Sequence, residues 1–311
     1  MSSAPTRTAS RASTASPSAD VIEWAATEGA AVTLRFLVYL DLLLLAGLSL
    51  CARRTVPAEV PARVVVGLAA AGAVLTVAQF LATTLAMTGG DITVLDQEML
   101  RYLAVETPMG RSSIARFLLL MLIAIAATAG PRARSLNALL AVAALATLAW
   151  SGHAGASEGG VGAIHRASDI AHLIAASAWL GTLALLLFAL ARSSTATADL
   201  IAALRRFAMT GTLIVGALIV TGIVNLWAIV GLDALPEWAA TGYGRTLGLK
   251  LMLFAAMLGF AAYNRWRLTP RLENEELEGL GHLRMSVSFE TALAVGVVMV
   301  VAVLGTLSPT G

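Results

Sequence analysis

The side chains best suited to chemistry gather in one short stretch of the chain, which contains His153, His165, Asp169 and His172. Each residue of a helix turns by about 100°, so positions 165, 169 and 172 fall within roughly 60° of one another on one stripe. His165 and His172 lie about 10 Å apart along such a helix, with Asp169 between them and His153 reaching in from the preceding segment. Imidazole binds Cu, Zn, Ni and Fe. The spacing therefore predicts a metal site with His172 as the deepest ligand.

Other interpretations of these residues stay open. Asp169 could be an outer partner that holds a histidine tautomer, rather than a ligand. His153 and His172 could instead be the axial ligands of a b-type haem, although their expected depths in the protein differ. The fourth histidine, His282, stands alone in a predicted loop and has no assigned role.

Sulfur donors are sparse in this chain. Met87, Met99 and Met109 lie near one another in the sequence, and because thioethers favour Cu(I) they are candidates for accessory metal ligands. Methionine is also a common filler of apolar cores, so both interpretations are kept. The single cysteine, Cys51, excludes an internal disulfide framework and a Cys-clustered zinc or iron–sulfur site.

The composition indicates what kind of protein must position these groups. Of the 311 residues, 58% are apolar and 13% are charged, about half of the ~25% usual for soluble domains, and the mean hydropathy is +0.81. Such a chain is neither a water-soluble enzyme nor a disordered protein. A net charge of +2 is too small for a nucleic-acid-binding surface. The sequence predicts an integral membrane protein.

A bilayer core of ~30 Å needs roughly 20 apolar residues per helix, and the sequence offers eight such runs. They cover 30–51, 63–87, 113–130, 135–152, 165–191, 207–231, 245–263 and 286–307. We therefore expect an all-α integral membrane protein built as a bundle of eight transmembrane helices. Short additional helices are expected on the surface within 89–112 and 268–284.

The chain divides into three parts on this basis. Residues 1–28 are rich in Ser, Thr, Ala and Arg, lack the apolar core of a signal peptide and are expected to form a disordered periplasmic tail. Residues 29–152 hold the first four spans with the outer loop 89–112. Residues 153–311 hold the last four spans.

Basic residues in alternate loops predict the orientation of the bundle. Twelve of the 21 basic residues fall on one side, which we therefore place in the cytoplasm: Arg53, Arg54, Arg63, Arg132, Arg134, Arg192, Arg205, Arg206, Arg265, Arg267, Arg271 and Arg284. Both termini and the histidine-rich stretch are then expected on the periplasmic side of a bacterial inner membrane.

Ionisable residues inside predicted spans usually face the bundle interior or a water-filled path. Asp41 and Glu290 are candidate proton sites, and Lys250 could pair with Glu290, although opposite depths argue against direct contact. Three arginines near span ends are expected to extend their guanidinium groups to the interface: Arg35, Arg116 and Arg245.

The second half of the sequence carries motifs that are typical of one family. They are Ala171–Gly181 with His172 and Trp179, Thr221-Gly222, Thr241–Leu247 leading to Lys250, Asn264-Arg265, Pro270–Leu272, Arg284–Glu290 and Leu304–Pro309. In these motifs the chain resembles the copper resistance protein D family of inner-membrane copper-uptake proteins, closely over about 150–311. The first half is similar only in the number and spacing of its spans.

The resemblance implies copper passage across a bacterial inner membrane beside a periplasmic copper-binding protein of the copper resistance C type. This chain has only the polar tail ahead of its spans, so that partner is expected to be a separate protein. The resemblance marks His172, Trp179, Gly181, Tyr243, Gly244, Lys250, Asn264, Arg265 and Glu290.

We therefore expect a copper-handling membrane protein that is not an enzyme. It would bind a copper ion on the periplasmic side through His153, His165, Asp169 and His172 and pass it inward. The sequence has no ATP-binding loop and no P-type ATPase motif, so passage would follow a gradient or be coupled to protons. The alternatives are a haem-binding electron-transfer protein and a scaffold that delivers copper to a periplasmic oxidase without transport.

Overall fold

The computed structural model of the chain describes residues 17–52, 59–94, 96–151, 159–192, 196–231, 240–274 and 279–308, with side chains from Gly29 on except those of residues 94 and 273. His153, Arg53 and Arg54 lie outside these ranges, as do residues 1–16 of the predicted tail. From Pro17 on, the backbone of that tail is already helical.

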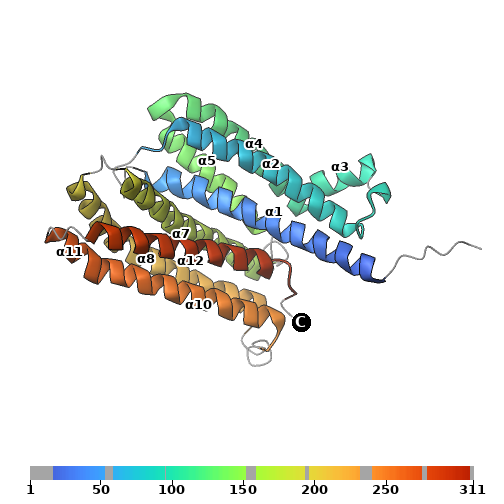
Figure 1. Cartoon of the computed structure of the whole chain (residues 1–311). Helices are drawn as coiled ribbons and strands as arrows, with labels where there is room; N and C mark the ends of the chain where they lie inside the picture. Colours follow the sequence, from blue (N-terminus) through green and yellow to red (C-terminus); the bar gives the residue numbers. More distant parts are fainter. Residues whose placement is uncertain are drawn as a thin grey trace, which may run out of the picture.

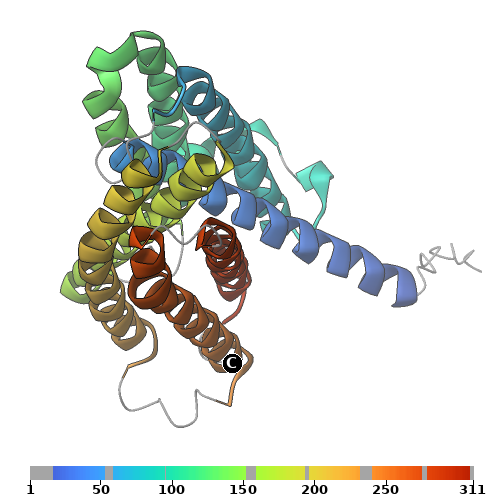
Figure 2. The ribbon, with the colours of Figure 1, turned by 60° about the vertical axis from the view of Figure 1, so that its left-hand side comes forward.

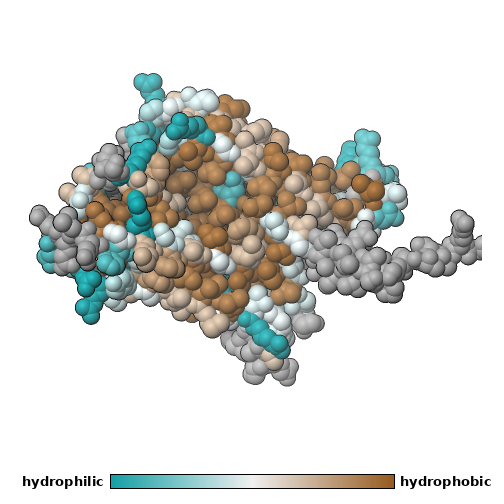
Figure 3. Space-filling model, viewed as in Figure 1, coloured by the Kyte–Doolittle hydropathy of each residue, from teal (hydrophilic) through white to brown (hydrophobic). Residues whose placement is uncertain are grey.

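Eight of the described helical segments are long and apolar enough to cross a membrane, which confirms the predicted fold class. They are α1 (Pro17–Cys51), α2 (Ala62–Met87), α4 (Pro108–Thr128), the segment Gly130–Trp150 that contains α5 (Arg134–Ala146), α7 (Gly159–Ala191), α8 (Thr197–Val230), α10 (Gly242–Tyr263) with its extension, and α12 (Gly279–Leu304). In Figure 3 apolar side chains dominate the middle of the molecule, while hydrophilic ones concentrate toward its two ends.

The two expected surface helices have different outcomes. A short helix, α3 (Gln97–Val105), does form within 89–112, where the Asp96 carboxylate caps it by accepting the Met99 N–H at 2.7 Å. Within 268–284 the described residues form only a short helix that directly continues the preceding span, followed by the start of the last span. Helix α10 continues through a π-turn, η4 (Asn264–Leu268), into α11 (Thr269–Glu273), and α12 already begins at Gly279. The buried leucines of this segment pack into the core at the ends of two spans.

Helix α1 lies between two groups of helices, as Figures 1 and 2 both show. On one side it packs against α2 and α5, with α4 behind them, and on the other side against α7 and α12. Helix α8 packs chiefly against α7, and α10 chiefly against α12. We call the end of the bundle that holds Ser151 and Gly159 the outer end, after the predicted topology, and the end that holds Cys51 and Ala191 the inner end.

Helix α7 is the central element of the second group. Of its most apolar stretch, 61% is buried, compared with 6% for α8 and 6% for α10, which face outward over most of their length. A membrane helix that is buried in this way is surrounded by protein rather than lipid. Polar side chains on α7 therefore face other helices and the spaces between them.

Two glycines allow α1 and α7 to cross with their backbones in contact. A Cβ atom on Gly47 would lie 2.0 Å from the carbonyl oxygen of Ser177, and one on Gly181 would lie 2.2 Å from the carbonyl carbon of Gly47. No side chain fits there. Small residues at helix crossings let backbones approach and pack closely in membranes, where lipid removes the hydrophobic driving force between helices.

We predict that Gly47→Ala destabilises the protein by about 3 kcal/mol, because the added methyl group forces the α1–α7 crossing apart. The measurement is thermal unfolding of the purified protein in detergent. Gly216→Ala on α8 is the matched control, since its Cβ would meet nothing within 4 Å. Equal stability of the two variants would show that the close crossing does not matter.

Candidate functional site

A polar cavity of about 200 Å³ lies between α1, α7, α8, α10 and α12 toward the outer end of the bundle. We call it the outer cavity. It brings together the predicted ligands on α7 with polar side chains from the other helices: Arg35, Tyr39, His165, Asp169, His172, Asn225, Tyr243 and Lys250. The stripe expected from helical spacing therefore does face a single cavity.

His172 is held in one orientation by α8. Its Nδ1 lies 2.9 Å from the Thr221 hydroxyl oxygen, and that hydroxyl donates its own hydrogen to the Ala217 carbonyl at 2.6 Å. A hydroxyl has one hydrogen to give, so Thr221 accepts from an Nδ1–H of His172. The neutral imidazole then keeps its lone pair on Nε2, the form that binds metals. Gly222 leaves room beside the ring, since its Cβ would lie 3.9 Å from His172 Cε1.

The charges of the outer cavity come from three helices. Asp169 on α7 lies within electrostatic reach of Lys250 on α10 and of Tyr39 and Tyr243. Arg35 on α1 lies against Gly305 at the end of α12. The sequence raised a pairing of Lys250 with Glu290, but Lys250 lies with Asp169 and His172 in this cavity, and Glu290 does not line it.

The predicted metal cluster is only partly within the described residues. In that part of the chain no group of three or more His, Cys, Asp or Glu side chains is arranged to hold a metal ion. His153, the fourth member, lies outside it, so the four-residue site stays a prediction. His165 is buried, with 2% of its surface exposed. The methionines proposed as accessory ligands, Met87, Met99 and Met109, do not line the outer cavity.

A second, mostly apolar cavity of about 360 Å³ adjoins the outer cavity toward the inner end. We call it the middle cavity. His172 and Lys250 line both cavities, so they stand at the boundary between them. Its other walls are apolar, with Leu180, Phe254 and Met257 among them, and Trp179 of α7 closes its far end.

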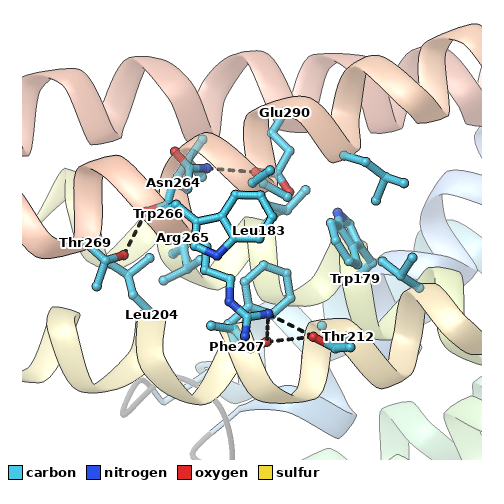
Figure 4. A pocket seen from close by; sticks show the side chains of 18 residues that line it. Trp179, Leu183, Leu204, Phe207, Thr212, Asn264, Arg265, Trp266, Thr269 and Glu290 are labelled. Atoms are coloured by element: carbon cyan, nitrogen blue, oxygen red, sulfur yellow. Dashed lines mark hydrogen bonds between the residues drawn. The ribbon is translucent and has the colours of Figure 1, made fainter.

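A third cavity, of about 330 Å³, lies beyond Trp179 and is lined by α7, α8, α10, η4, α11 and α12. We call it the inner cavity. Figure 4 shows Asn264 donating from Nδ2 to Glu290 Oε2, at 2.9 Å, while Arg265 turns the other way. The Arg265 guanidinium donates to the Ala208 carbonyl at 3.0 Å and to the Thr212 hydroxyl at 2.9 Å, both on α8. The π-turn thus directs the adjacent side chains of Asn264 and Arg265 toward different helices. Turns of this kind are frequent at functional sites.

Asp41 lies away from the three cavities. It is buried at 7% exposure on the face of α1 that meets α2, where a Cβ on Gly72 would lie 2.4 Å from Asp41 Oδ2. It therefore does not face the cavities in which Glu290 and His172 lie.

The expectation that three arginines reach the membrane interface holds only for Arg245, which is exposed and donates to the Ala240 carbonyl. It is wrong for Arg116, which is 1% exposed. Arg116 donates from Nε to Thr147 Oγ1 at 2.8 Å and from Nη2 to Ser151 Oγ at 3.0 Å. Hydroxyl groups on the neighbouring span replace the water that the guanidinium would otherwise seek. Arg35 also turns inward, to the outer cavity.

Tyr39 and Asn225 line the outer cavity but were not singled out from the sequence. Asn225 could have been found from the sequence, because a polar amide within the apolar run 207–231 usually faces the bundle interior or a polar cavity. Tyr39 offers none, since a tyrosine near a span end is usual at an interface.

Fold and site together define a multi-pass membrane protein with a chain of cavities along one buried helix, and comparison with known proteins identifies its family. Residues 201–304 match the family model described as "Copper resistance protein D", and residues 25–163 match that of the "Copper resistance protein D-like, N-terminal domain". The chain belongs to the copper resistance protein D family. The similarity to the family thus extends to the first half of the chain, in which we had recognised no family motif.

Two curated relatives are similar to this chain. "Copper resistance protein D" of Pseudomonas syringae pv. tomato is 31% identical over 299 residues, which cover 89% of this chain and 96% of that protein. "Inner membrane protein YebZ" of Escherichia coli (strain K12) is 31% identical over 163 residues, which cover 52% of this chain and 55% of that protein. No solved structure matches.

We predict that Arg116→Ala destabilises the protein by about 3 kcal/mol, because it removes two hydrogen bonds made by a buried charged group. Thermal unfolding in detergent measures the effect. Arg245→Ala, at an exposed arginine, should stay within about 0.5 kcal/mol of the wild type. A small effect at Arg116 would mean that its hydroxyl contacts do not anchor α4 to the segment Gly130–Trp150.

Proposed function

We propose that the chain binds copper in the outer cavity and passes it across the membrane toward the inner end. His172 is the principal ligand in this proposal, and a bound ion would draw His165, Asp169 and His153 toward it as the further ligands. Copper is the cargo here and not a resident cofactor, and the proposal assigns no enzymatic reaction. The family is named for copper resistance, and both chemistry and geometry favour histidine as the group that receives the ion.

One observation carries the proposal: the three cavities follow one another along α7 and share lining residues at each boundary. His172 and Lys250 line the outer and middle cavities, and Trp179 lines the middle and inner cavities. A copper ion bound to His172 Nε2 would already lie at the entrance to the middle cavity. A scaffold that only hands copper to an outside partner has no use for such a series.

We further propose that the outer end faces the periplasm of a bacterial inner membrane. The basic residues of the described loops support this orientation, and one relative is named an inner membrane protein. Copper would then arrive from the periplasm, delivered by a soluble copper-binding protein of the copper resistance C type.

We predict that His172→Ala lowers copper binding and copper uptake by at least about tenfold, since the lost ligand lies where water cannot easily replace it. Copper occupancy of the purified protein and uptake into proteoliposomes provide the two measurements. His282→Ala, at an exposed histidine near the start of α12, is the matched control and should behave as wild type.

The same measurements separate the alternatives. Full copper occupancy in His172→Ala would remove the site from the outer cavity. Copper binding without uptake by the wild type would favour a scaffold. A Soret absorption band in the purified protein would favour the haem-binding alternative, in which His153 and His172 are axial ligands.

Thr221→Val offers a finer test, because valine keeps the shape of threonine and removes the hydroxyl that accepts from His172 Nδ1. We predict a loss of copper affinity of about 10-fold to 100-fold, the usual effect of removing the partner of a ligating histidine. Competition titration with a chelator measures it. Thr212→Val, on the same helix but at the inner cavity, should leave the affinity unchanged. Equal affinities for the two variants would show that Thr221 does not orient the ligand.

A further inference from the structure

Three buried polar groups, two that line the inner cavity and one on the same face of α12, lack the partners that buried groups normally have. Glu290, Asn264 and Ser286 are 1%, 7% and 5% exposed. Within the described residues, Glu290 Oε1, Asn264 Oδ1 and Ser286 Oγ make no hydrogen bond. Ser286 lies one helical turn before Glu290, on the same face of α12. Unpaired polar atoms at one buried place indicate that something else occupies it.

Among the residues that the structure describes, no cation pairs with the carboxyl of Glu290. The one other charged residue that lines the inner cavity, Arg265, donates to Ala208 and Thr212 on α8. Trp179 on α7 lies close enough to interact with the carboxyl but does not reach hydrogen-bond geometry.

The charged groups on the remaining neighbours of α12 lie elsewhere. Lys250 of α10 lines the outer and middle cavities, and Arg267 of η4 is exposed. On α1, Arg35 lines the outer cavity and Asp41 faces Gly72 on α2. On α11, Arg271 is exposed. An ionised carboxylate without a counter-ion is strongly disfavoured inside a membrane. Glu290 therefore holds a proton unless a cation comes close.

The inner cavity gives this proton a way in and out. Its volume of about 330 Å³ holds several water molecules, and water enters a cavity where two or more polar partners await it. Glu290 and Asn264 both line the cavity, and a small rotation of their side chains would bring the buried Oε1 and Oδ1 atoms to that water. The apolar walls of the middle cavity separate them from the polar outer cavity.

We propose that Glu290, held by the hydrogen bond from Asn264 Nδ2, carries one proton that it exchanges with water in the inner cavity as copper passes. This rests on the proposed function and names the ion that the cargo displaces at the inner cavity. The proton leaves Oε1 when the copper cation arrives and returns when copper departs, and no electrons move. For Cu(I), one positive charge thus replaces another, so the low-dielectric interior never holds an uncompensated charge.

The test is copper uptake by the purified protein in proteoliposomes whose internal buffer is set to different pH values. The wild type should take up copper at an initial rate that depends on the pH of the compartment at the inner end. Glu290→Gln, which keeps the shape and the hydrogen bond from Asn264, should lose that dependence and keep the copper occupancy of the outer cavity. Glu59→Gln, at an exposed carboxylate that pairs with Arg134, is the matched control and should behave as wild type.

Infrared difference spectra between acidic and alkaline buffers give a second readout that needs no transport. The wild type should show a carboxylic acid C=O band that shifts in D2O, and Glu290→Gln should lack it. Should that variant fail to fold, Glu290→Asp must shift the band.

The outcomes are separable. The proposal is overturned if Glu290→Gln keeps either the band or the pH dependence of uptake, or if it loses copper from the outer cavity. Absence of copper uptake by the wild type overturns the proposed function instead, and the infrared band then decides the protonation of Glu290 by itself.

Discussion

The contact between Gly47 and Gly181 is the constraint on which the rest of the bundle depends. It is the place where α1, which leads from the first half of the chain, touches α7, which organises the second half. Because neither residue has a side chain, the two backbones pack directly. In lipid, close packing of this kind drives helices to associate, as the hydrophobic effect does in water. It also brings Arg35 and Tyr39 of α1 into the wall of the outer cavity.

Helix α7, which packs against α1, contributes side chains to all three cavities. His165, Asp169, His172 and Trp179 follow one another along this helix, and the other helices supply the opposite walls of three successive cavities. The chemistry changes along the way, from imidazole and carboxylate through apolar side chains to an amide and a carboxyl. An ion that travels along α7 would meet a good ligand, then a barrier, then a second polar place.

Several buried polar groups in this bundle are satisfied by neighbours on other helices. Thr221 orients His172, and the hydroxyls of Thr147 and Ser151 accept hydrogen bonds from Arg116. Glu290 is only half satisfied, since Asn264 engages one of its oxygens and leaves the other open. A group that is half satisfied is ready to bind or release something, whereas the fully satisfied groups hold the helices in place.

The sequence by itself determined the membrane fold and the eight spans, because long apolar runs admit no other structure in lipid. It also placed His165, Asp169 and His172 on one face, since that follows from helical spacing alone. Only the tertiary structure decided which residues meet across helices. The tertiary structure places Lys250 in the same cavity as Asp169 and not beside Glu290. It brings Thr221 to His172 and buries Arg116 against hydroxyl groups. These partners come from distant spans, and no local pattern records the packing that brings them together.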